Sequence, residues 1–455
     1  MLIDKKTDFS QPELSFDEID AGLTTKEAIS EAKRCLNCQT PLCRKGCPIG
    51  NDIPGFIHAL ANGNIGEASA IIAKRSSLPA VCGRVCPHER QCEGSCVLNR
   101  KNSGIQVGKL ERFIADFDAE MGIHVHKNEL PVQGKVAVIG SGPAGLTVAG
   151  DLAKLGFAVT IFESQAEPGG VLMYGIPEFR LNKGIVRREI RRIQELGVEI
   201  RTNVLVGPDL TVDTLFAEGF DAVFIGTGTA LAKTLNLPGE ELPGVFQATY
   251  FLSMVALTRA GSLDIREIPV APRDRVVIVG AGNVAMDAAR TALRLGAVKV
   301  TVVYRRTEQE ITAERSEFDA AQNEGVEFLW LASPVAVCGQ NKVTGLEYEI
   351  QTLDADKKLQ PTGRRETVAA DVIMLAIGQR PAARIVSTTQ GIDVDGNGYV
   401  ITRERPYGMT TRKGVFAGGD VVHEPATVVL AMKEAKKVAA GIAQYIEAKT
   451  LLENC

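Results

Sequence analysis

Apolar residues recur every three or four positions in several short stretches between about residues 25 and 125, and polar residues separate these stretches. This spacing puts the apolar side chains on one face of a helix. The pattern predicts a small all-α region with helices at 26–34, 54–62, 65–74 and 108–121.

From about Gly134 onward the pattern changes to short β-branched runs, each followed by glycines and an alanine-rich helix. This order is typical of βαβ units in a parallel sheet. Two such units stand out, KVAVIGSGPAGLTVAGDLAKLG from Lys135 and RVVIVGAGNVAMDAARTALRLG from Arg275, and one dinucleotide-binding domain's length of chain separates them. The repeat predicts two related nucleotide-binding domains.

The first glycine turn has the G-x-G-x-x-G pattern between a strand and a helix, the context in which this motif binds a dinucleotide. Its glycines allow a tight turn, close approach of pyrophosphate to the backbone, and close packing of the helix on the strand. Glu163 ends the next strand, where a carboxylate bonds both ribose hydroxyls and repels a 2′-phosphate. We expect FAD or NAD here rather than NADP; the alternative is an ordinary strand–helix junction. The candidate residues of the turn are Gly140, Gly142, Pro143, Ala144 and Gly145.

The second glycine turn has alanine in the third glycine position, and its candidate residues are Gly280, Gly282, Asn283 and Val284. Tyr304 occupies the place that corresponds to Glu163, and Arg305 and Arg306 follow it. Two guanidinium groups at this strand end are suited to hold a 2′-phosphate, which favours NADPH over NADH. The alternative is that both arginines form a solvated surface pair.

Opposite ribose preferences at the two turns indicate a relay in which NADPH reduces a bound flavin. Further along the chain, one apolar strand ends at Gly378, and another ends at Gly419 and Asp420. In two-domain flavoproteins such an aspartate bonds the ribityl chain, and the next helix, here starting near Thr427, points its N-terminus at the flavin and stabilises the reduced form. Taken alone, this second strand end is equally consistent with an ordinary turn.

Eight of the ten cysteines lie between residues 35 and 96, and only Cys338 and Cys455 lie outside this stretch. Because the later two form no pair, we expect no redox-active disulfide beside the flavin and no catalytic role for either. A disulfide framework is typical of small exported domains, which does not fit this chain. The spacing of Cys35, Cys38, Cys43 and Cys47 resembles a ferredoxin run in which the last cysteine binds the other cluster. The eight thiolates suit two 4Fe-4S clusters, and the alternative is structural zinc.

The 455 residues include 45% apolar and 23% charged residues, an ordinary globular composition, with a net charge of −4. We therefore expect no nucleic-acid and no membrane partner. Residues 1–30 are polar, and no run of about 18 apolar residues occurs, which favours a cytoplasmic protein.

Several sequence motifs together resemble the small (β) subunit of bacterial NADPH-dependent glutamate synthase. The chain is equally similar to the N-terminal half of dihydropyrimidine dehydrogenase, to its separate bacterial flavin subunit, and to the large subunit of electron-bifurcating NADH-dependent ferredoxin:NADP oxidoreductase. The resemblance rests on CLNCQTPLCRKGCP, CGRVCPHERQCEGSC, VGKLERF, GSGPAGL, GGVLMYGIPEFRL, GAGNVAMDAAR, VYRRTEQE and FAGGD, in this order.

The resemblance implies a ligand set that differs from eight thiolates. It places one cluster on Cys35, Cys38, Cys43 and Cys96, and the other on Cys47, Cys86, Cys92 and Glu111, which leaves Cys82 without a cluster. A carboxylate ligand is a harder donor than a thiolate and changes the potential of that cluster. The resemblance also brings four further residues to FAD: Gly169, Gly170, Arg180 and Thr427.

The chain departs from glutamate synthase small subunits at Ile311 and Thr312, where these usually have Met-Pro. Arg305 and Arg306 resemble the NADP-using members more than the NAD-dependent pyrimidine-reducing flavin subunit. These differences leave the individual member of the family open.

We therefore predict an α/β fold in which an N-terminal all-α iron–sulfur domain (1–130) precedes two Rossmann-like domains. The FAD domain comprises 131–254 and 376–455, and the NADPH domain (255–375) is inserted in it. The predicted function is an electron-input subunit that passes hydride from NADPH to FAD and single electrons through two 4Fe-4S clusters, with no catalytic acid or base.

A partner chain must carry the terminal substrate site, because the sequence lacks a glutaminase, an FMN barrel or a pyrimidine pocket motif. The partner is expected to resemble the glutamate synthase large subunit, a pyrimidine-reducing subunit or a ferredoxin-reductase-like subunit. The alternatives are the flavin subunit of an NAD(P)-dependent dihydropyrimidine dehydrogenase or of an electron-bifurcating enzyme, and a scaffold without turnover. Intact motifs at both nucleotide sites argue against the scaffold.

Overall fold

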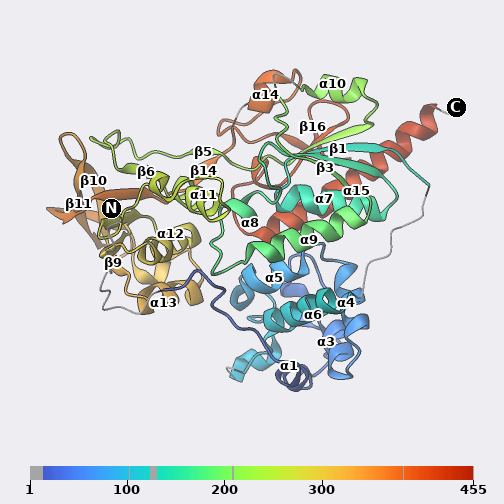
Figure 1. Cartoon of the computed structure of the whole chain (residues 1–455), viewed down its shortest axis with the longest axis horizontal. Coiled ribbons are helices and arrows are strands. Elements are labelled where there is room, and N and C mark those ends of the chain that lie inside the picture. The colour runs from blue at the N-terminus through green and yellow to red at the C-terminus, as the bar shows by residue number, and fades with distance from the viewer. Residues whose placement is uncertain (1–13, 102, 123–130, 208–209, 383, 454–455) are drawn as a thin grey trace, which may run out of the picture. The chain divides into compact units, whose positions relative to one another are not determined.

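The computed structural model describes residues 14–101, 103–122, 131–207, 210–382 and 384–453 (Figure 1). The chain folds into two compact units. The smaller unit comprises the described residues of 1–19, 174–179 and 233–377, and the larger unit comprises those of 20–173, 180–232 and 378–455. Residues 233–377, the longest segment of the smaller unit, therefore lie between two segments of the larger unit, as the predicted insertion of one domain in the other requires.

The N-terminal part of the larger unit is helical, which confirms the predicted all-α region. The four predicted helices form within two residues of the predicted bounds, and two shorter ones, α2 and α5, were not predicted. Its elements are α1 (Thr25–Ala32), α2 (Leu42–Gly46), α3 (Ile53–Ala61), α4 (Ile65–Ala73), α5 (Pro79–Val85), η1 (His88–Arg90), η2 (Val97–Lys101) and α6 (Val107–Met121).

Helix α1 begins with a capping box, in which Thr24 Oγ1 accepts from the Glu27 backbone and Glu27 accepts from the Thr24 backbone. The core of this region contains Phe56, Leu60 and Leu110, with several cysteines packed against it. The short helices are therefore held together by packing rather than by their own propensity.

A seven-stranded sheet forms the rest of the larger unit, in the order β15-β16-β17-β4-β1-β2-β3. The five strands from β17 to β3 are parallel, and β16 and β15 are antiparallel. The strands are β1 (Lys135–Ile139), β2 (Ala158–Phe162), β3 (Glu199–Arg201), β4 (Ala222–Ile225), β15 (Thr402–Glu404), β16 (Tyr407–Thr410) and β17 (Val415–Ala417).

Helices cover this sheet, and α7 packs on β1 and β2 and against the long C-terminal helix α15 (Figure 1). The helices are α7 (Pro143–Lys154), α8 (Val171–Tyr174), α9 (Lys183–Glu195), α10 (Val212–Ala217), α14 (Arg384–Thr388), η5 (Gly419–Val421) and α15 (Val428–Glu453). No helix in the part of the chain that the structure describes is long and apolar enough to cross a membrane.

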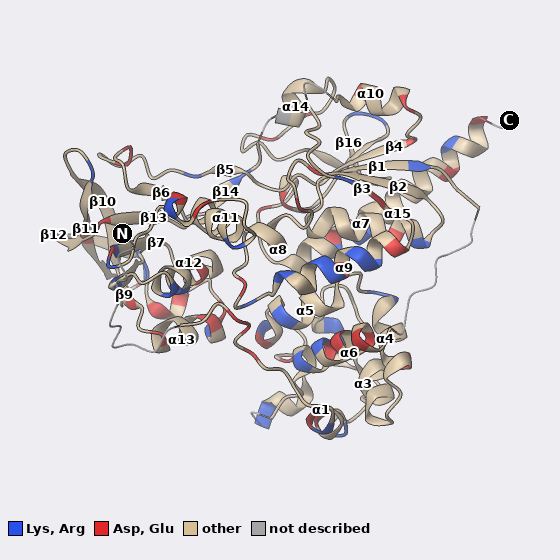
Figure 2. Cartoon of the chain, viewed as in Figure 1, with Lys and Arg blue, Asp and Glu red and all other residues tan. Residues whose placement is uncertain are grey.

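Ion pairs join the helical region to the sheet region within the larger unit. In Figure 2 the ribbon of α9 is blue at many positions, which marks Lys and Arg, and the ribbon of α6 has red positions, which mark Asp and Glu. Arg188 Nη2 of α9 lies 2.5 Å from Asp116 Oδ1 of α6, and Arg192 Nη2 lies 2.6 Å from Asp118 Oδ2. Because Asp118 is almost fully buried, its pair with Arg192 neutralises a charge that would otherwise be costly inside the protein.

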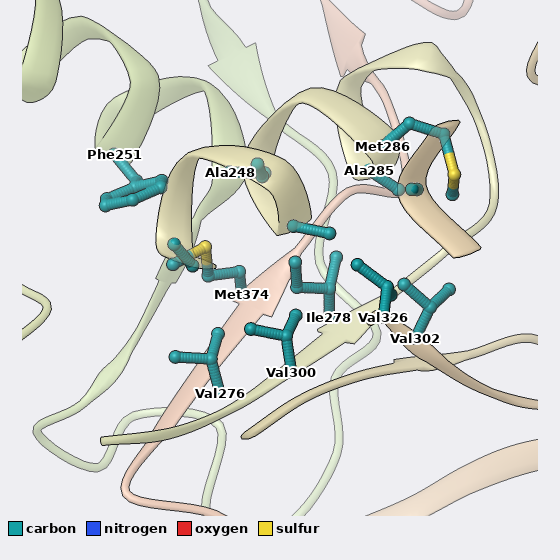
Figure 3. Close-up of a cluster of buried hydrophobic side chains, with 14 of the residues drawn as sticks. Ala248, Phe251, Val276, Ile278, Ala285, Met286, Val300, Val302, Val326 and Met374 are labelled. Carbon is teal, nitrogen blue, oxygen red and sulfur yellow. The ribbon is translucent and has the colours of Figure 1, made fainter. Parts of the chain in front are cut away.

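The smaller unit contains a five-stranded parallel sheet in the order β6-β13-β7-β8-β9 and an antiparallel sheet β10-β11-β12. The first sheet and its helices enclose a core that includes Phe251, Ile278 and Met374 (Figure 3). Its elements are β6 (Val245–Gln247), α11 (Ala248–Arg259), η3 (Ile265–Glu267), β7 (Arg275–Val279), α12 (Asn283–Arg294), β8 (Lys299–Val303), η4 (Glu308–Glu310), α13 (Arg315–Asn323), β9 (Glu327–Leu329), β10 (Ala332–Gly339), β11 (Val343–Leu353), β12 (Leu359–Ala369) and β13 (Val372–Leu375).

The boundary between the two units differs from the predicted division at 254/255 and 375/376. The chain passes between the units near residues 232 and 377, next to the paired strands β5 (Leu231–Ala232) and β14 (Gln379–Arg380). Strand β6 pairs with β13, and α11 packs on α12, so residues 245–254 belong with the smaller unit. The three residues of β6 are too few to show a strand pattern in the sequence. The division of the whole chain into three domains stays a prediction.

Candidate functional site

The first glycine turn lies at the carboxyl end of β1, and its glycines are required by close contacts. Gly140 has a φ of +96°, and a Cβ there would lie 2.7 Å from the carbonyl oxygen of Gly226. A Cβ on Gly145 would lie 1.9 Å from the carbonyl oxygen of Gly140. Gly142 caps α7, and a Cβ there meets no atom within 4 Å. Open space therefore lies beside the helix N-terminus, where a phosphate group fits.

The Gly169-Gly170 loop lies against this turn. A Cβ on Gly170 would come within 2.9 Å of Gly142 Cα, and the Gly169 N–H donates to Ser141 Oγ at 2.9 Å. Ser141 was not predicted as a functional residue, although it lies inside the motif. The loop and the turn therefore form one continuous backbone surface.

Glu163 follows β2 and is buried beside the turn. Its Oε2 accepts from the Ser141 N–H at 3.0 Å and from Ser141 Oγ at 2.5 Å. Its Oε1 accepts from the Gln165 N–H at 2.8 Å and from Ser164 Oγ at 3.2 Å. The carboxylate thus orients the glycine turn, whereas the sequence led us to expect bonds to ribose hydroxyls. That ribose contact stays a prediction, because ribose would have to replace some of these four donors.

The carboxyl end of β17 brings Gly419 and Asp420 to the same edge of the sheet. A Cβ on Gly419 would lie 2.8 Å from the Cβ of Ala144, next to Pro143 at the start of α7. Burial raises the pKa of Asp420 to about 6, and only His423 opposes this. Thr427 precedes α15, and its Oγ1 accepts from the Leu430 N–H at 3.4 Å. The residues predicted around FAD on β1, β2 and β17 therefore converge at one sheet edge, the usual position of such sites.

Two other predicted FAD residues lie near the chain crossings between the units. Arg180 is half-buried, and Gly378 is exposed with a φ of +93°. Their contact with FAD stays a prediction.

The second glycine turn lies at the carboxyl end of β7 in the smaller unit. Gly280 has a φ of +118°, and a Cβ there would lie 2.5 Å from the carbonyl oxygen of Ala376. Gly282 caps α12, and its added Cβ would meet only Thr312 Oγ1, at 3.3 Å. The turn therefore leaves the N-terminus of α12 approachable, which fits a pyrophosphate.

The segment after Arg306 is joined to this turn by hydrogen bonds to Ala281 and Asn283. The N–H groups of Thr312 and Ala313 donate to the carbonyl oxygen of Ala281, at 3.2 and 3.1 Å. The Glu314 N–H donates to Asn283 Oδ1 at 2.8 Å. Asn283 therefore positions this segment, while Val284 is 38% exposed beside it.

Arg305 and Arg306 follow β8 and Tyr304, and both are exposed. Arg306 Nη1 lies 3.7 Å from Glu310 Oε1, an acidic neighbour that was not predicted. The exposed guanidinium groups suit a 2′-phosphate, since a buried pair would not admit one.

Four predicted cluster ligands surround one pocket in the helical region. Cys35, Cys38, Cys43 and Cys96 line it together with apolar side chains such as Leu36 and Ile57. Burial raises the pKa of the Cys35 thiol, and the nearby thiols of Cys38 and Cys96 raise it further. Burial likewise raises the pKa of Cys43 to about 11. Thiols that resist ionisation alone are stabilised as thiolates by a cationic metal centre.

The other predicted ligands form a second, deeper group. Burial raises the pKa of Cys47 to about 11, and the nearby Glu111 adds to the shift. Burial, Glu93, Glu111 and Cys47 together raise the pKa of Cys92. Glu111 is itself buried, which raises its pKa to about 8, and its Oε1 accepts from Asn51 Nδ2 at 3.4 Å. A buried carboxyl group among thiols fits a metal centre that supplies positive charge.

Cys82 lies beside this second group. The Cys86 pKa is raised chiefly by a hydrogen bond with Cys82, and then by burial. The Cys82 thiol also contacts Met432 Sδ of α15 at 3.6 Å. Cys82 therefore has protein partners, and its absence from the cluster ligands stays a prediction.

The two groups of thiols, together with Cys82, account for the eight cysteines between residues 35 and 96. Among the described residues, no group of three or more His, Cys, Asp or Glu side chains is arranged to hold a single metal ion. Of the two cysteines outside these groups, Cys338 is half-buried, and Cys455 lies outside the described residues.

Two family models match the chain. Residues 13–123 match the family described as dihydropyrimidine dehydrogenase domain II, 4Fe-4S cluster. Residues 134–435 match the pyridine nucleotide-disulphide oxidoreductase family. The first match covers the helical region, and the second covers both glycine turns.

Two relatives align with almost the whole chain. A glutamate synthase (NADPH) small chain of Halomonas elongata is 38% identical over 442 residues, which cover 95% of this chain and 93% of the relative. The NAD-dependent dihydropyrimidine dehydrogenase subunit PreT of Escherichia coli is 37% identical over 431 residues, which cover 95% and 97%.

Among solved structures, Mycobacterium tuberculosis FprA in complex with NADPH has a similar fold, with a TM-score of 0.61. The match covers 72% of this chain and 87% of FprA, at 20% identity. This likeness shows the fold alone.

Proposed function

Because the chain belongs to the glutamate synthase small-chain family of FAD- and iron–sulfur-containing NADPH-dependent oxidoreductases, we propose that it is the electron-input subunit of a larger enzyme. The observation that carries this proposal is that one chain combines two glycine turns at helix N-termini with two groups of buried or half-buried thiols. When bound, FAD accepts a hydride from NADPH and releases its electrons singly to 4Fe-4S clusters, which is the chemistry that these groups supply.

In the proposed FAD site, residues 140–145 hold the pyrophosphate at the N-terminus of α7. Glu163 fixes the turn through Ser141, and the 169–170 loop closes one side of it. Asp420 bonds the ribityl chain, and Thr427 begins the helix whose positive end faces the flavin. Arg180 and Gly378 complete the proposed contacts.

In the proposed NADPH site, the N-terminus of α12 holds the pyrophosphate, and Gly280 and Gly282 keep its approach open. Arg305 and Arg306 hold the 2′-phosphate. Asn283 and Val284 border the same turn. No side chain of this chain is proposed to exchange a proton with the nicotinamide, because hydride transfer depends on positioning.

We also propose two 4Fe-4S clusters. The first has Cys35, Cys38, Cys43 and Cys96 as ligands, and the second has Cys47, Cys86, Cys92 and Glu111. In the second site Asn51 holds the Glu111 carboxyl group in place through its side-chain amide. This division is supported by the two groups of mutually perturbed thiols.

The partner is proposed to be a second catalytic subunit of the glutamate synthase large-subunit type, because a glutamate synthase small chain is 38% identical over 95% of this chain. The similarity to PreT favours a second candidate, the flavin subunit of a dihydropyrimidine dehydrogenase. The exposed Arg305 and Arg306 support the first candidate, since PreT is named as NAD-dependent.

The test is anaerobic purification from the native host, followed by metal and flavin analysis and mass spectrometry of co-purifying chains. We expect about eight iron atoms and one FAD per chain, with an amidotransferase-type partner. A pyrimidine-reducing partner or a ferredoxin-reductase-like partner would transfer the function to the corresponding enzyme. Zinc without iron would contradict the electron-transfer mechanism.

A further inference from the structure

Glu310 is an acidic residue at the edge of the proposed 2′-phosphate site. Its Oε1 lies 3.7 Å from Arg306 Nη1, and the two side chains are 41% and 46% exposed. An incoming 2′-phosphate and Glu310 therefore compete for the same guanidinium group. Arg305, by contrast, forms no ion pair among the residues that the structure describes.

Three further contacts keep Glu310 in this position. Its Oε2 accepts from the Thr307 N–H at 3.2 Å and from Thr307 Oγ1 at 3.0 Å, which completes a capping box on η4. The Tyr304 hydroxyl donates to the Glu310 carbonyl oxygen at 3.0 Å. The carboxylate is thus held by the N–H and hydroxyl groups of Thr307, and these bonds oppose its movement away from an arriving phosphate.

Glu308 provides an internal comparison on the same turn. Its Oε1 lies 2.8 Å from Arg315 Nη1, so its charge is paired with a residue outside the Arg305-Arg306 pair. Two glutamates two positions apart therefore differ in the arginine that they contact, and only Glu310 contacts the proposed phosphate site.

We propose that Glu310 is a specificity-determining residue, which acts as the internal counterion of Arg306 and reduces the preference of this site for a 2′-phosphorylated nucleotide. The proposal rests on the assignment of Arg305 and Arg306 under the proposed function. A fixed carboxylate beside a bound phosphate repels it, whereas a nucleotide without the 2′-phosphate lacks that repulsion. The preference of the site for a nucleotide with a 2′-phosphate over one without it is therefore smaller than the two arginines alone would produce.

The test compares Glu310→Gln with wild type in the anaerobically purified full chain. Glutamine keeps the capping box, since its amide oxygen accepts from Thr307, but it removes the charge. The probes are adenosine 2′,5′-bisphosphate and 5′-AMP, which differ only in the 2′-phosphate, and the readout is the equilibrium dissociation constant. We expect about three- to tenfold tighter bisphosphate binding, no change for 5′-AMP, and a smaller gain at high salt.

Glu308→Gln is the matched control and should change neither constant. Equal effects of both variants on the bisphosphate, or equal effects of Glu310→Gln on both probes, would overturn the role of Glu310. The double variant Arg305→Ala/Arg306→Ala tests the underlying assignment separately, because it should abolish the preference for the bisphosphate. A preference that survives in the double variant would contradict the arginine assignment itself.

Discussion

The glycines of the first turn are required for different reasons. Gly145 is required by packing, since a Cβ there would overlap the Gly140 carbonyl oxygen at 1.9 Å. Gly142 is not required by packing, because a Cβ there meets nothing within 4 Å. The same substitution at these two positions should therefore separate folding from nucleotide binding.

Gly145→Ala should destabilise the larger unit by about 2–4 kcal/mol, because backbone must move to relieve the overlap. Gly142→Ala should leave the unfolding temperature of the flavin-free protein unchanged but lower FAD affinity, since its methyl group occupies the phosphate approach. The measurements are thermal unfolding by circular dichroism and FAD titration. Unchanged FAD affinity in Gly142→Ala would contradict the proposed site.

Cys82 and Cys86 also differ at the residue scale, although they lie on or next to the same helix. Cys82→Ala should keep the full iron content, because the proposed ligand set leaves out Cys82, whose thiol contacts Cys86 and Met432. Cys86→Ala should lose the iron of the second cluster. Iron analysis and electron paramagnetic resonance after anaerobic reduction check both variants. Equal loss of iron in both variants would indicate that Cys82 is also a ligand, as in the alternative with eight thiolate ligands.

At the scale of elements, α12 and α13 are joined by buried charges. Arg290 Nη1 lies 2.5 Å from Glu317 Oε2, and its Nη2 lies 2.8 Å from Glu324 Oε1. Arg294 Nη1 lies 2.6 Å from Glu324 Oε2. Burial alone would raise the pKa of Glu324, but Arg294 and Arg290 outweigh it and lower that pKa.

Glu324→Gln should lower the free energy of unfolding of the smaller unit by about 2–4 kcal/mol at neutral pH, because the buried guanidinium group of Arg294 loses its carboxylate partner and that of Arg290 keeps only Glu317. A carboxyl group whose pKa is lower in the folded protein than in the unfolded chain stabilises the fold at pH values above its unfolded pKa. This stabilisation is lost as the pH falls through the folded pKa. The difference from wild type should therefore shrink with acidification. Trp330, the single tryptophan, lies in this unit and reports its unfolding by fluorescence.

Glu327→Gln is the control for this prediction. Glu327 pairs with Lys299 at 2.8 Å, but both side chains are about half exposed. Exposed pairs contribute about 0–1 kcal/mol, so this variant should unfold like wild type. A pH-independent deficit in Glu324→Gln would show that packing, and not charge, causes the loss.

At the scale of the whole molecule, the helical region contains mostly short helices, and half-buried cysteines pack on its core. Removal of the clusters by acid or a chelator should therefore lower the unfolding temperature of this region, as metal binding is coupled to folding. The Trp330 transition of the smaller unit should stay unchanged. Circular dichroism and tryptophan fluorescence on one sample distinguish the two regions. A shared shift would show that the units unfold together.

The expected cytoplasmic location stays a prediction at this scale, as does the identity of the partner. Neither property follows from contacts within one chain, since both depend on surfaces and signals that the fold leaves open.

The helices and glycine turns were predictable because the interactions that form them span only a few residues. Apolar spacing marks a helix such as α6, and the positive φ of Gly140 and Gly280 follows from the tight turn that each motif makes. Helix α5 and strand β6 were missed because seven and three residues are too few to display a period. The boundary near residue 232 differs from the predicted division at 254/255 for the same reason, since β6 lies between these two positions.

By itself the sequence determined the family, the two nucleotide motifs and the clustering of cysteines, since these depend on residue type and short spacing. Only the tertiary structure decided which distant groups meet. It brings Cys96 close to Cys35 and places the carboxylate of Glu163 against Ser141. Such contacts depend on how segments far apart in the sequence pack together. Patterns of residues over a short stretch of sequence do not specify this packing.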